Sequence, residues 1–383
     1  MKQIPYANQW IEEDDMLAVT NALKSSNLTQ GPLIEEFEKN MAQYCGVKYA
    51  VAVNSGTSAL HIACLAAGVG GGDEVITSAN TFVASANCVL YCGGKPVFAD
   101  IEADTACIDP KDIKKKITDK TKAIIPVHFA GQPADMEEIH KIAKEKNLVI
   151  IEDAAHAIGA KYRVRNSHDW VKVGSCFHSD MTILSFHPVK HITTGEGGMV
   201  LTNNHDLYEK LVFFRSHGIT RNKKYMKETE GLWYYEMHEL GFNYRITDIQ
   251  CSLGISQLKK IDRFIAKRKE IAKIYDKAFS EIEQLDYIKE RDGFDSSRHL
   301  YVILTEDRKN VFNWLIAEAN MLVNVHYIPV YFHPYYRRLG HRRGLCPVAE
   351  NYYSRAISIP MFPKLTINEA EYVVAKIKQV VSG

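Results

Sequence analysis

Short apolar runs alternate with helical patterns through the first two-thirds of the chain, and this alternation restricts the fold more than any other feature. Runs of about five apolar residues predict strands at 49–53, 74–77, 96–99, 123–127, 148–151, 181–185 and 199–201. Helical periods separate several of them, for example at 135–146. Strands that are apolar on both faces and linked by helices predict an α/β fold, with a mostly parallel, mixed sheet between helices.

The pattern changes in the last third of the chain. Residues 247–277 predict one long helix or two abutting helices. Strands are expected at 299–304 and 322–325, with a helix at 310–319. Thr366 and Glu369 have the spacing of a capping box that opens a final helix. We therefore expect a large domain at residues 1–255, with an N-terminal helical segment, and a smaller C-terminal α+β domain at 256–383.

Composition and spacing exclude several classes of function. Lys plus Arg is 47 and Asp plus Glu is 46, so the basic excess typical of a nucleic-acid binder is missing. Neither a membrane span nor a secretion signal is expected, and eight cysteines without a C-x-x-C pair are typical of a cytoplasmic protein with reduced thiols. His187 and His191 are four residues apart, but Pro188 breaks the helix that a metal pair would need. No metal site is expected.

An anion site is predicted where the first strand meets its helix, at Ser55-Gly56-Thr57-Ser58. The first N–H groups of a helix have no partner within the helix, and the dipole makes that end positive. The hydroxyls add further donors, so a phosphate would be held there. An ordinary helix N-cap without a ligand is the alternative reading, because Ser and Thr are common caps.

A carboxylate and an imidazole follow the strand at 148–151. Asp153 lies at its C-terminal end, where ligand crevices form in α/β sheets, and His156 is close enough in sequence to reach the same ligand. A carboxylate in this place can pair with a protonated ring nitrogen. The alternative is an aspartate that only caps a helix.

Lys190 follows the strand at 181–185 and precedes a glycine-rich turn. A lysine in a partly desolvated cleft has a lowered pKa and acts as a nucleophile, whereas a surface lysine only covers apolar surface with its stem. A lysine for a Schiff base, a carboxylate for the ring nitrogen and a phosphate cradle together predict pyridoxal 5'-phosphate (PLP). Ser185 would add a phosphate contact, and Phe82 would stack on the ring.

Five stretches resemble the DegT/StrS family of fold-type I aminotransferases, which act on nucleotide-linked keto-sugars. They are Asn54-Ser-Gly-Thr-Ser-Ala-Leu60, Gly72-Asp-Glu-Val75, Ile151-Glu-Asp-Ala-Ala-His156, residues 185–198 and residues 241–248. The resemblance covers nearly the whole chain. It implies roles for seven residues: attachment of PLP by Lys190, pairing of Asp153 with the ring nitrogen, a place for His156 beside the ring, phosphate contacts from Thr57, Ser58 and Ser185, and a phosphate contact from Asn243 of a neighbouring subunit. The family therefore implies a homodimer with shared active sites.

Residues 186–198 are similar to one subgroup in particular. Its members use L-glutamate to aminate C4 of a UDP-linked 4-keto-6-deoxy-N-acetylhexosamine of the L-altrose type, in pseudaminic acid biosynthesis. By this resemblance Glu196, His326 and Tyr327 lie on the substrate side. Arg337 would meet the UDP diphosphate, because guanidinium groups suit phosphate oxygens, and a basic surface loop is the alternative reading. Two alternatives remain open: the same chemistry on another nucleotide keto-sugar (at C3, or at C4 of a D-configured sugar), and a PLP sugar dehydratase. Lys190 disfavours the dehydratase, because those relatives have a histidine there.

Overall fold

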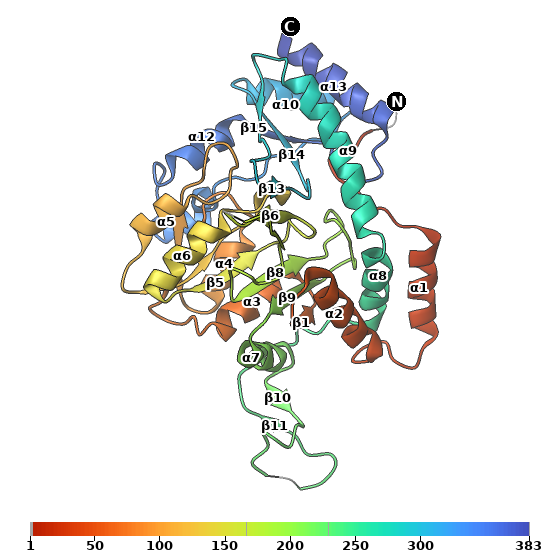
Figure 1. Ribbon diagram of the computed structural model, residues 1–383, viewed down its shortest axis with the longest axis vertical. Coiled ribbons are helices and arrows are strands. Elements are labelled where there is room, and N and C mark those ends of the chain that lie inside the picture. The colour runs from red at the N-terminus through yellow and green to blue at the C-terminus, as the bar shows by residue number, and fades with distance from the viewer. Residues whose placement is uncertain (1–2, 166, 229, 383) are drawn as a thin grey trace.

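A seven-stranded sheet forms the centre of the larger part of the molecule (Figure 1). The computed structural model describes residues 3–165, 167–228 and 230–382. The strand order is β1-β9-β8-β5-β4-β2-β3. β9 is antiparallel to both neighbours and the other pairs are parallel, which confirms the predicted mixed sheet. The strands are β1 Tyr49–Val53, β2 Glu74–Ser78, β3 Lys95–Ala99, β4 Thr121–Ile125, β5 Val149–Asp153, β8 Met181–Ser185 and β9 Gly198–Thr202.

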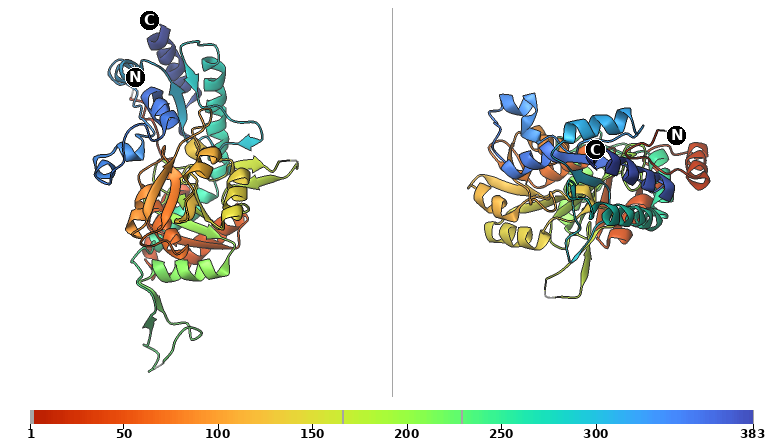
Figure 2. Two further views of the ribbon diagram at one scale, coloured as in Figure 1. Left: turned by 90° about the vertical axis from the view of Figure 1, so that its left-hand side faces the viewer. Right: turned by 90° about the horizontal axis from the view of Figure 1, so that it is seen from above.

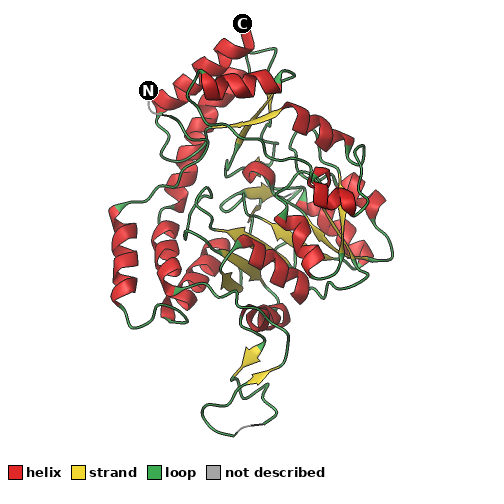
Figure 3. Ribbon diagram, turned by 180° about the vertical axis from the view of Figure 1, so that it is seen from behind, coloured by secondary structure: helices red, strands yellow, loops and turns green. Residues whose placement is uncertain are grey.

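Helices cover both faces of this sheet, as Figure 3 shows from behind. Alternate residues of each strand point to opposite faces. In β1, Val51 and Val53 pack with α3, α4 and α7, whereas Ala50 and Ala52 belong to the core that includes α2, α5 and α6. The helices of this part are α1 Glu13–Lys24, α2 Pro32–Cys45, α3 Gly56–Ala66, α4 Ala84–Tyr91, α5 Pro110–Lys116, α6 Met136–Lys146, α7 His205–Arg215 and α8 Asp248–Leu258.

A second core lies in the part of the molecule at the top of Figure 1. α9 connects the two cores, because Phe264 packs in the first and Tyr275 in the second. α8 ends at Leu258 and α9 begins at Ile261, so the expected helical region is two abutting helices. The predicted capping box forms, since the backbone N–H of Thr366 donates to Glu369. The elements are α9 Ile261–Phe279, β12 Asp286–Tyr287, β14 Tyr301–Leu304, α10 Arg308–Ala317, β15 Ala356–Ile359 and α13 Ile367–Ser382, with sheet order β12-β14-β15.

The strand expected at 322–325 is wrong. Only isolated bridges form there, from Met321 to Ile4 and from Asn324 to Ser358. The N-terminal segment takes the pairing position, because Leu322 donates its N–H to the carbonyl of Ile4 (2.8 Å). The domain boundary at residue 255 stays a prediction. Several residues beyond that boundary belong to the first core, among them Val330, Tyr331, Phe332, Tyr336 and Tyr352.

An arm projects from the molecule at the bottom of Figure 1 and in the left view of Figure 2. It holds the short pair β10 Ile219–Thr220 and β11 Glu236–Met237. Large apolar side chains are exposed on it, including Leu232 (100%) and Leu240 (78%). Such exposure of apolar surface marks a contact surface. The remaining elements are β6 Lys161–Arg163, β7 Trp170–Lys172, β13 Phe294–Asp295, η1 Phe129–Gly131, η2 Val330–Phe332, α11 Pro334–Arg338 and α12 Pro347–Arg355.

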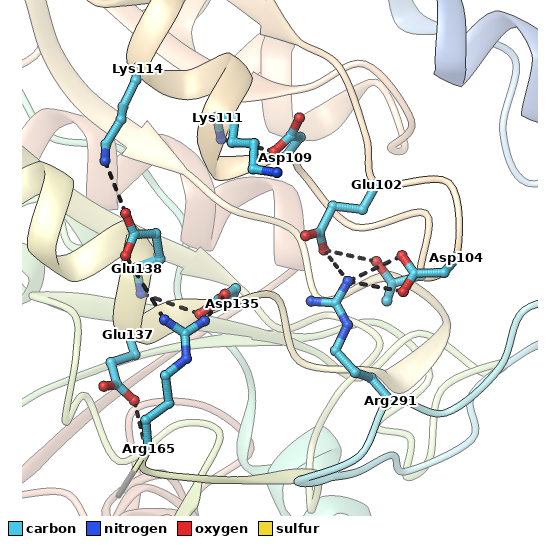
Figure 4. A network of polar contacts seen from close by, with 11 residues as sticks. Glu102, Asp104, Asp109, Lys111, Lys114, Asp135, Glu137, Glu138, Arg165 and Arg291 are labelled. Carbon is cyan, nitrogen blue, oxygen red and sulfur yellow. Dashed lines mark hydrogen bonds and ion pairs between the residues drawn. The ribbon is translucent and has the colours of Figure 1, made fainter.

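Ion pairs connect the loop before β13 to the segment before α5, and the loop after β6 to the start of α6 (Figure 4). Arg291 donates to Glu102 (2.9 Å) and to Asp104 (3.1 Å), and Arg165 pairs with Asp135. Exposed pairs of this kind contribute about 0–1 kcal/mol each, so they orient the loops more than they stabilise the fold. No helix in the described ranges is long and apolar enough to cross a bilayer.

Candidate active site

A cavity of about 740 Å³ opens at the C-terminal ends of β5 and β8, below the start of α3 and α4. This is the edge of an α/β sheet where ligands bind. Residues 324–328 of the C-terminal part close its other side. Nine residues predicted from the sequence line it together: Thr57, Phe82, Asp153, His156, Ser185, Lys190, Glu196, His326 and Tyr327.

Lys190 is placed by a tightly bonded loop between β8 and β9. Phe186 anchors that loop, because its N–H donates to Gly197 (2.9 Å) and its carbonyl accepts from the N–H of Thr194 (3.0 Å). Burial lowers the pKa of Lys190 to about 8, although the negative charge of Asp153 acts in the opposite direction. About one-tenth of the amine is therefore neutral near pH 7, and the neutral amine is the nucleophile.

Asp153 ends β5 and is almost fully buried. The Ser85 hydroxyl donates to its Oδ2 (2.7 Å), and the N–H of Ala155 donates to Oδ1 (3.1 Å). No helix begins after it, since the following described residues form turns. The aspartate therefore caps no helix here, and its carboxylate faces the cavity that Lys190 also lines.

His156 and Tyr327 connect the two sides of the cavity. The Tyr327 hydroxyl lies 3.0 Å from His156 Nε2. Burial lowers the pKa of His156 well below its usual 6.5, and the nearby Lys190 lowers it further. Its Nδ1 is buried without a hydrogen-bond partner among the described residues. An unsatisfied buried polar atom is costly, so this nitrogen is suited to a group bound beside it.

Two glycines allow the phosphate cradle to form. A Cβ on Gly198 would lie 2.4 Å from the carbonyl oxygen of Ser55, and a Cβ on Gly56 would lie 3.0 Å from Cβ of Ser185. The start of α3 therefore packs directly on the ends of β8 and β9. The Ser55 hydroxyl caps α3 by accepting from the N–H of Ser58 (3.0 Å), and Thr57 lines the cavity.

Gly198→Ala should disrupt this cradle. The new Cβ meets backbone atoms that cannot move independently, so we expect a loss of about 2–3 kcal/mol in unfolding free energy and weaker PLP binding. Urea unfolding and PLP titration of the PLP-free protein measure both. Gly71→Ala is the matched control, because a Cβ there meets no atom within 4 Å. Wild-type PLP affinity in Gly198→Ala would contradict the assignment of this turn to the phosphate.

Three predicted site residues lie outside the cavity lining. The Ser58 hydroxyl donates to Asn54 (2.6 Å) within the cap of α3. Asn243 is exposed and bridges to Ser216, and Arg337 is exposed in α11. Their roles stay predictions.

Sequence reasoning missed Tyr6, Ser85 and His299, which also line the cavity. Tyr6 reaches it because Ile4 pairs beside Met321, and the carbonyl of Tyr6 accepts from the N–H of Met361 (3.0 Å). No local signal in the first residues predicts this pairing. Ser85 has a weak signal in retrospect, since it is a polar residue on an apolar helix that follows Phe82.

A second cavity of about 690 Å³ lies beside β6 and the Arg291 loop. Its guanidinium groups at Arg165 and Arg291 are engaged by carboxylates (Figure 4), so they are not free to bind an anion. The described part of the chain contains no group of three or more metal-binding side chains arranged around a common point.

PLP fits the first cavity. Lys190 presents a largely desolvated amine, Asp153 a buried carboxylate, α3 its N-terminal turn, and Phe82 a ring that is 57% exposed. Residues 9–378 match the profile of the DegT/DnrJ/EryC1/StrS aminotransferase family. The chain belongs to this family of PLP-dependent aminotransferases.

Relatives and solved structures refine this class. The chain is 40% identical to the UDP-4-amino-4,6-dideoxy-N-acetyl-beta-L-altrosamine transaminase of Campylobacter jejuni strain 81-176, over 97% of this chain and 95% of the relative. It is 35% identical to the GDP-perosamine synthase of Escherichia coli O157:H7, over 100% of both chains. The structure matches Helicobacter pylori PseC, an aminotransferase of pseudaminic acid biosynthesis, with a TM-score of 0.90, 32% identity and 100% coverage of both chains. It matches the PLP form of a sugar aminotransferase, Spr1654 from Streptococcus pneumoniae, with a TM-score of 0.91, 30% identity and 99% coverage of both chains.

Proposed function

We propose that the protein is a cytoplasmic aminotransferase that moves the amino group of L-glutamate to C4 of a UDP-linked 4-keto-6-deoxy-N-acetylhexosamine of the L-altrose type. The product would serve pseudaminic acid biosynthesis. The observation that carries the chemistry is that a desolvated Lys190 and a buried Asp153 line the same cavity. The 40% identity to the altrosamine transaminase supports the substrate.

Each residue has a separate task. Bound PLP supplies a carbonyl for amine exchange and a ring that accepts electrons. Lys190 Nζ would attach the cofactor, and as a free amine it would take up and return the proton at the reacting carbon in each half-reaction. Asp153 would supply the carboxylate that favours a protonated ring nitrogen, and Ser85 orients it. His156, held by Tyr327, offers its free nitrogen beside the ring.

The side of the cavity that residues 324–328 form carries no charged side chain. His326 Nδ1 lies 2.8 Å from the Ser358 hydroxyl, and burial lowers its pKa to about 3. A neutral imidazole suits sugar hydroxyls. Lys190 is the one Lys or Arg side chain that lines the cavity in the described residues, so a diphosphate must meet cations beyond its rim. Arg337 is one helical turn from the rim residue His333, whose carbonyl accepts from its N–H (3.1 Å).

The configuration of the sugar should decide the rate. Proton delivery by Lys190 requires the carbonyl carbon to present one face, so an epimer binds without reacting well. We expect kcat/KM for UDP-4-keto-6-deoxy-N-acetyl-β-L-altrosamine to exceed that for the D-gluco isomer by about 10-fold or more, with glutamate as donor. GDP- and dTDP-linked 4-keto-sugars complete the panel. Equal or reversed preference between the two epimers would overturn the substrate assignment and leave the aminotransferase class intact. A preference for the GDP-linked sugar of perosamine synthesis would have the same consequence.

A homodimer with shared sites is part of the proposal. Asn243 is exposed at the base of the arm, and the arm carries exposed Leu232, Trp233 and Leu240, which a second copy would cover. Mixing inactive Lys190→Ala with impaired Asn243→Ala should restore activity, because one hybrid site contains both intact residues. No recovery in confirmed heterodimers would exclude the shared contact.

A further inference from the structure

Arg268 of α9 is a fully buried guanidinium without a carboxylate partner. Its exposed fraction is 0%, and no Asp or Glu forms an ion pair with it among the residues described. Nη1 donates to the carbonyls of His299 (3.0 Å) and Met361 (2.8 Å). Nε and Nη2 have no partner in the described ranges. An unpaired buried charge is destabilising, so a purely structural role would be met better by a neutral side chain.

The guanidinium lies directly behind the cavity wall. His299, whose carbonyl it binds, lines the cavity together with Lys190. The His299 ring centroid is 4.3 Å from that of His156 and 5.4 Å from that of His191, which follows Lys190 in sequence. His191 is fixed in turn by the carbonyl of Ser297, 3.0 Å from its Nε2.

We propose that Arg268 is a positioning residue of the amine transfer, placing an unpaired positive charge behind Lys190 and holding His299 against His156. The inference rests on the proposed role of Lys190 as the attaching amine. Arg268 lies on α9, and no described residue of this helix lines the cavity.

The charge acts on several groups. Burial lowers the pKa values of Lys190, His191 and His299, and the positive charge of Arg268 lowers each of them further. His156 and His326 also face Lys190 and are neutral for the same main reason, burial. Asp153 is the carboxylate that opposes this effect at Lys190. Arg268 thus opposes the effect of Asp153 on the pKa of Lys190. Asp153 can supply its carboxylate to the ring nitrogen while the pKa of the Lys190 amine stays low.

The test uses PLP-free protein and follows the rate at which PLP attaches, by absorbance, as a function of pH. The rate rises as the amine loses its proton, so the midpoint reports the pKa of Lys190. We expect a wild-type midpoint near pH 8, from the lowered pKa of Lys190. Removing a nearby positive charge raises a lysine pKa, so Arg268→Gln should move the midpoint upward by about half a pH unit or more. Arg268→Lys keeps the positive charge, so its midpoint should stay close to the wild-type midpoint.

A structural role alone would lower the melting temperature of Arg268→Gln and leave its midpoint unchanged, which would overturn the proposal. If Arg268→Gln does not fold, Arg268→Met replaces it in the same test. An upward shift of the midpoint in Arg268→Lys as large as that in Arg268→Gln would also contradict the role of the positive charge. Lys190→Ala separates the two proposals. Attachment of PLP in that variant would overturn the proposed function, whereas attachment at Lys190 with unshifted midpoints would overturn only the role of Arg268.

Discussion

Lys190→Ala should fold normally and transfer no measurable amino group. The only lysine that lines the cavity in the described residues is lost, and with it both the cofactor attachment and the proton carrier. Removal of a catalytic nucleophile and base together lowers rates by about 10⁴-fold or more. The melting temperature should stay within a few degrees of the wild-type value, because the burial of the lost amine is itself unfavourable to folding. Turnover of glutamate to 2-oxoglutarate with the keto-sugar measures the effect.

Lys111→Ala is the matched control, since Lys111 is an exposed lysine on α5 and should leave the rate unchanged. Turnover above one-hundredth of wild type in Lys190→Ala would show that another group attaches the cofactor. An unfolded variant would be replaced by Lys190→Gln, which keeps most of the side-chain volume.

Asp153→Asn should slow the half-reaction with glutamate by about 10²–10⁴-fold and change stability little. The amide keeps an acceptor for the N–H of Ala155, and its NH₂ can donate to the Ser85 hydroxyl. It loses only the charge that favours the protonated ring nitrogen. Stopped-flow absorbance of the loaded variant with glutamate measures the rate.

Ser85→Ala is the companion variant, because it removes the hydrogen bond to Asp153 and keeps the carboxylate. A loss of about 10-fold is expected, the value of one hydrogen bond to a charged group. If Asp153→Asn loses its stability while activity per folded molecule persists, the aspartate is structural and the ring assignment is wrong.

The strands of the sheet were predictable because each is buried on both faces, which leaves a continuous apolar run bounded by turns. β1 and β8 match their predicted bounds, and the other strands of the sheet differ by one or two residues at one or both ends. Lys190 and Asp153 were predictable for a related reason. Asp153 ends a buried strand and Lys190 follows another, and parallel strands bring their C-terminal ends to one edge.

Residues that contacts distant in sequence place in the cavity lining or behind it were not predictable. Tyr6 depends on the bridge between Ile4 and Met321, and Arg268 depends on carbonyls of His299 and Met361. A local pattern cannot show such contacts. The same limit explains the wrong prediction of a strand at 322–325. This apolar run forms no ladder and makes only isolated bridges, to Ile4 and to Ser358.

Transfer of ¹⁵N from L-[¹⁵N]glutamate tests the central claim most directly. The purified protein, loaded with PLP, is incubated with UDP-4-keto-6-deoxy-N-acetyl-β-L-altrosamine, and the sugar product is analysed by mass spectrometry and NMR, with Lys190→Ala as the blank. The account predicts one ¹⁵N at C4 for each 2-oxoglutarate formed, and none in the blank. A product without ¹⁵N, or conversion of the sugar without consumption of glutamate, would contradict it.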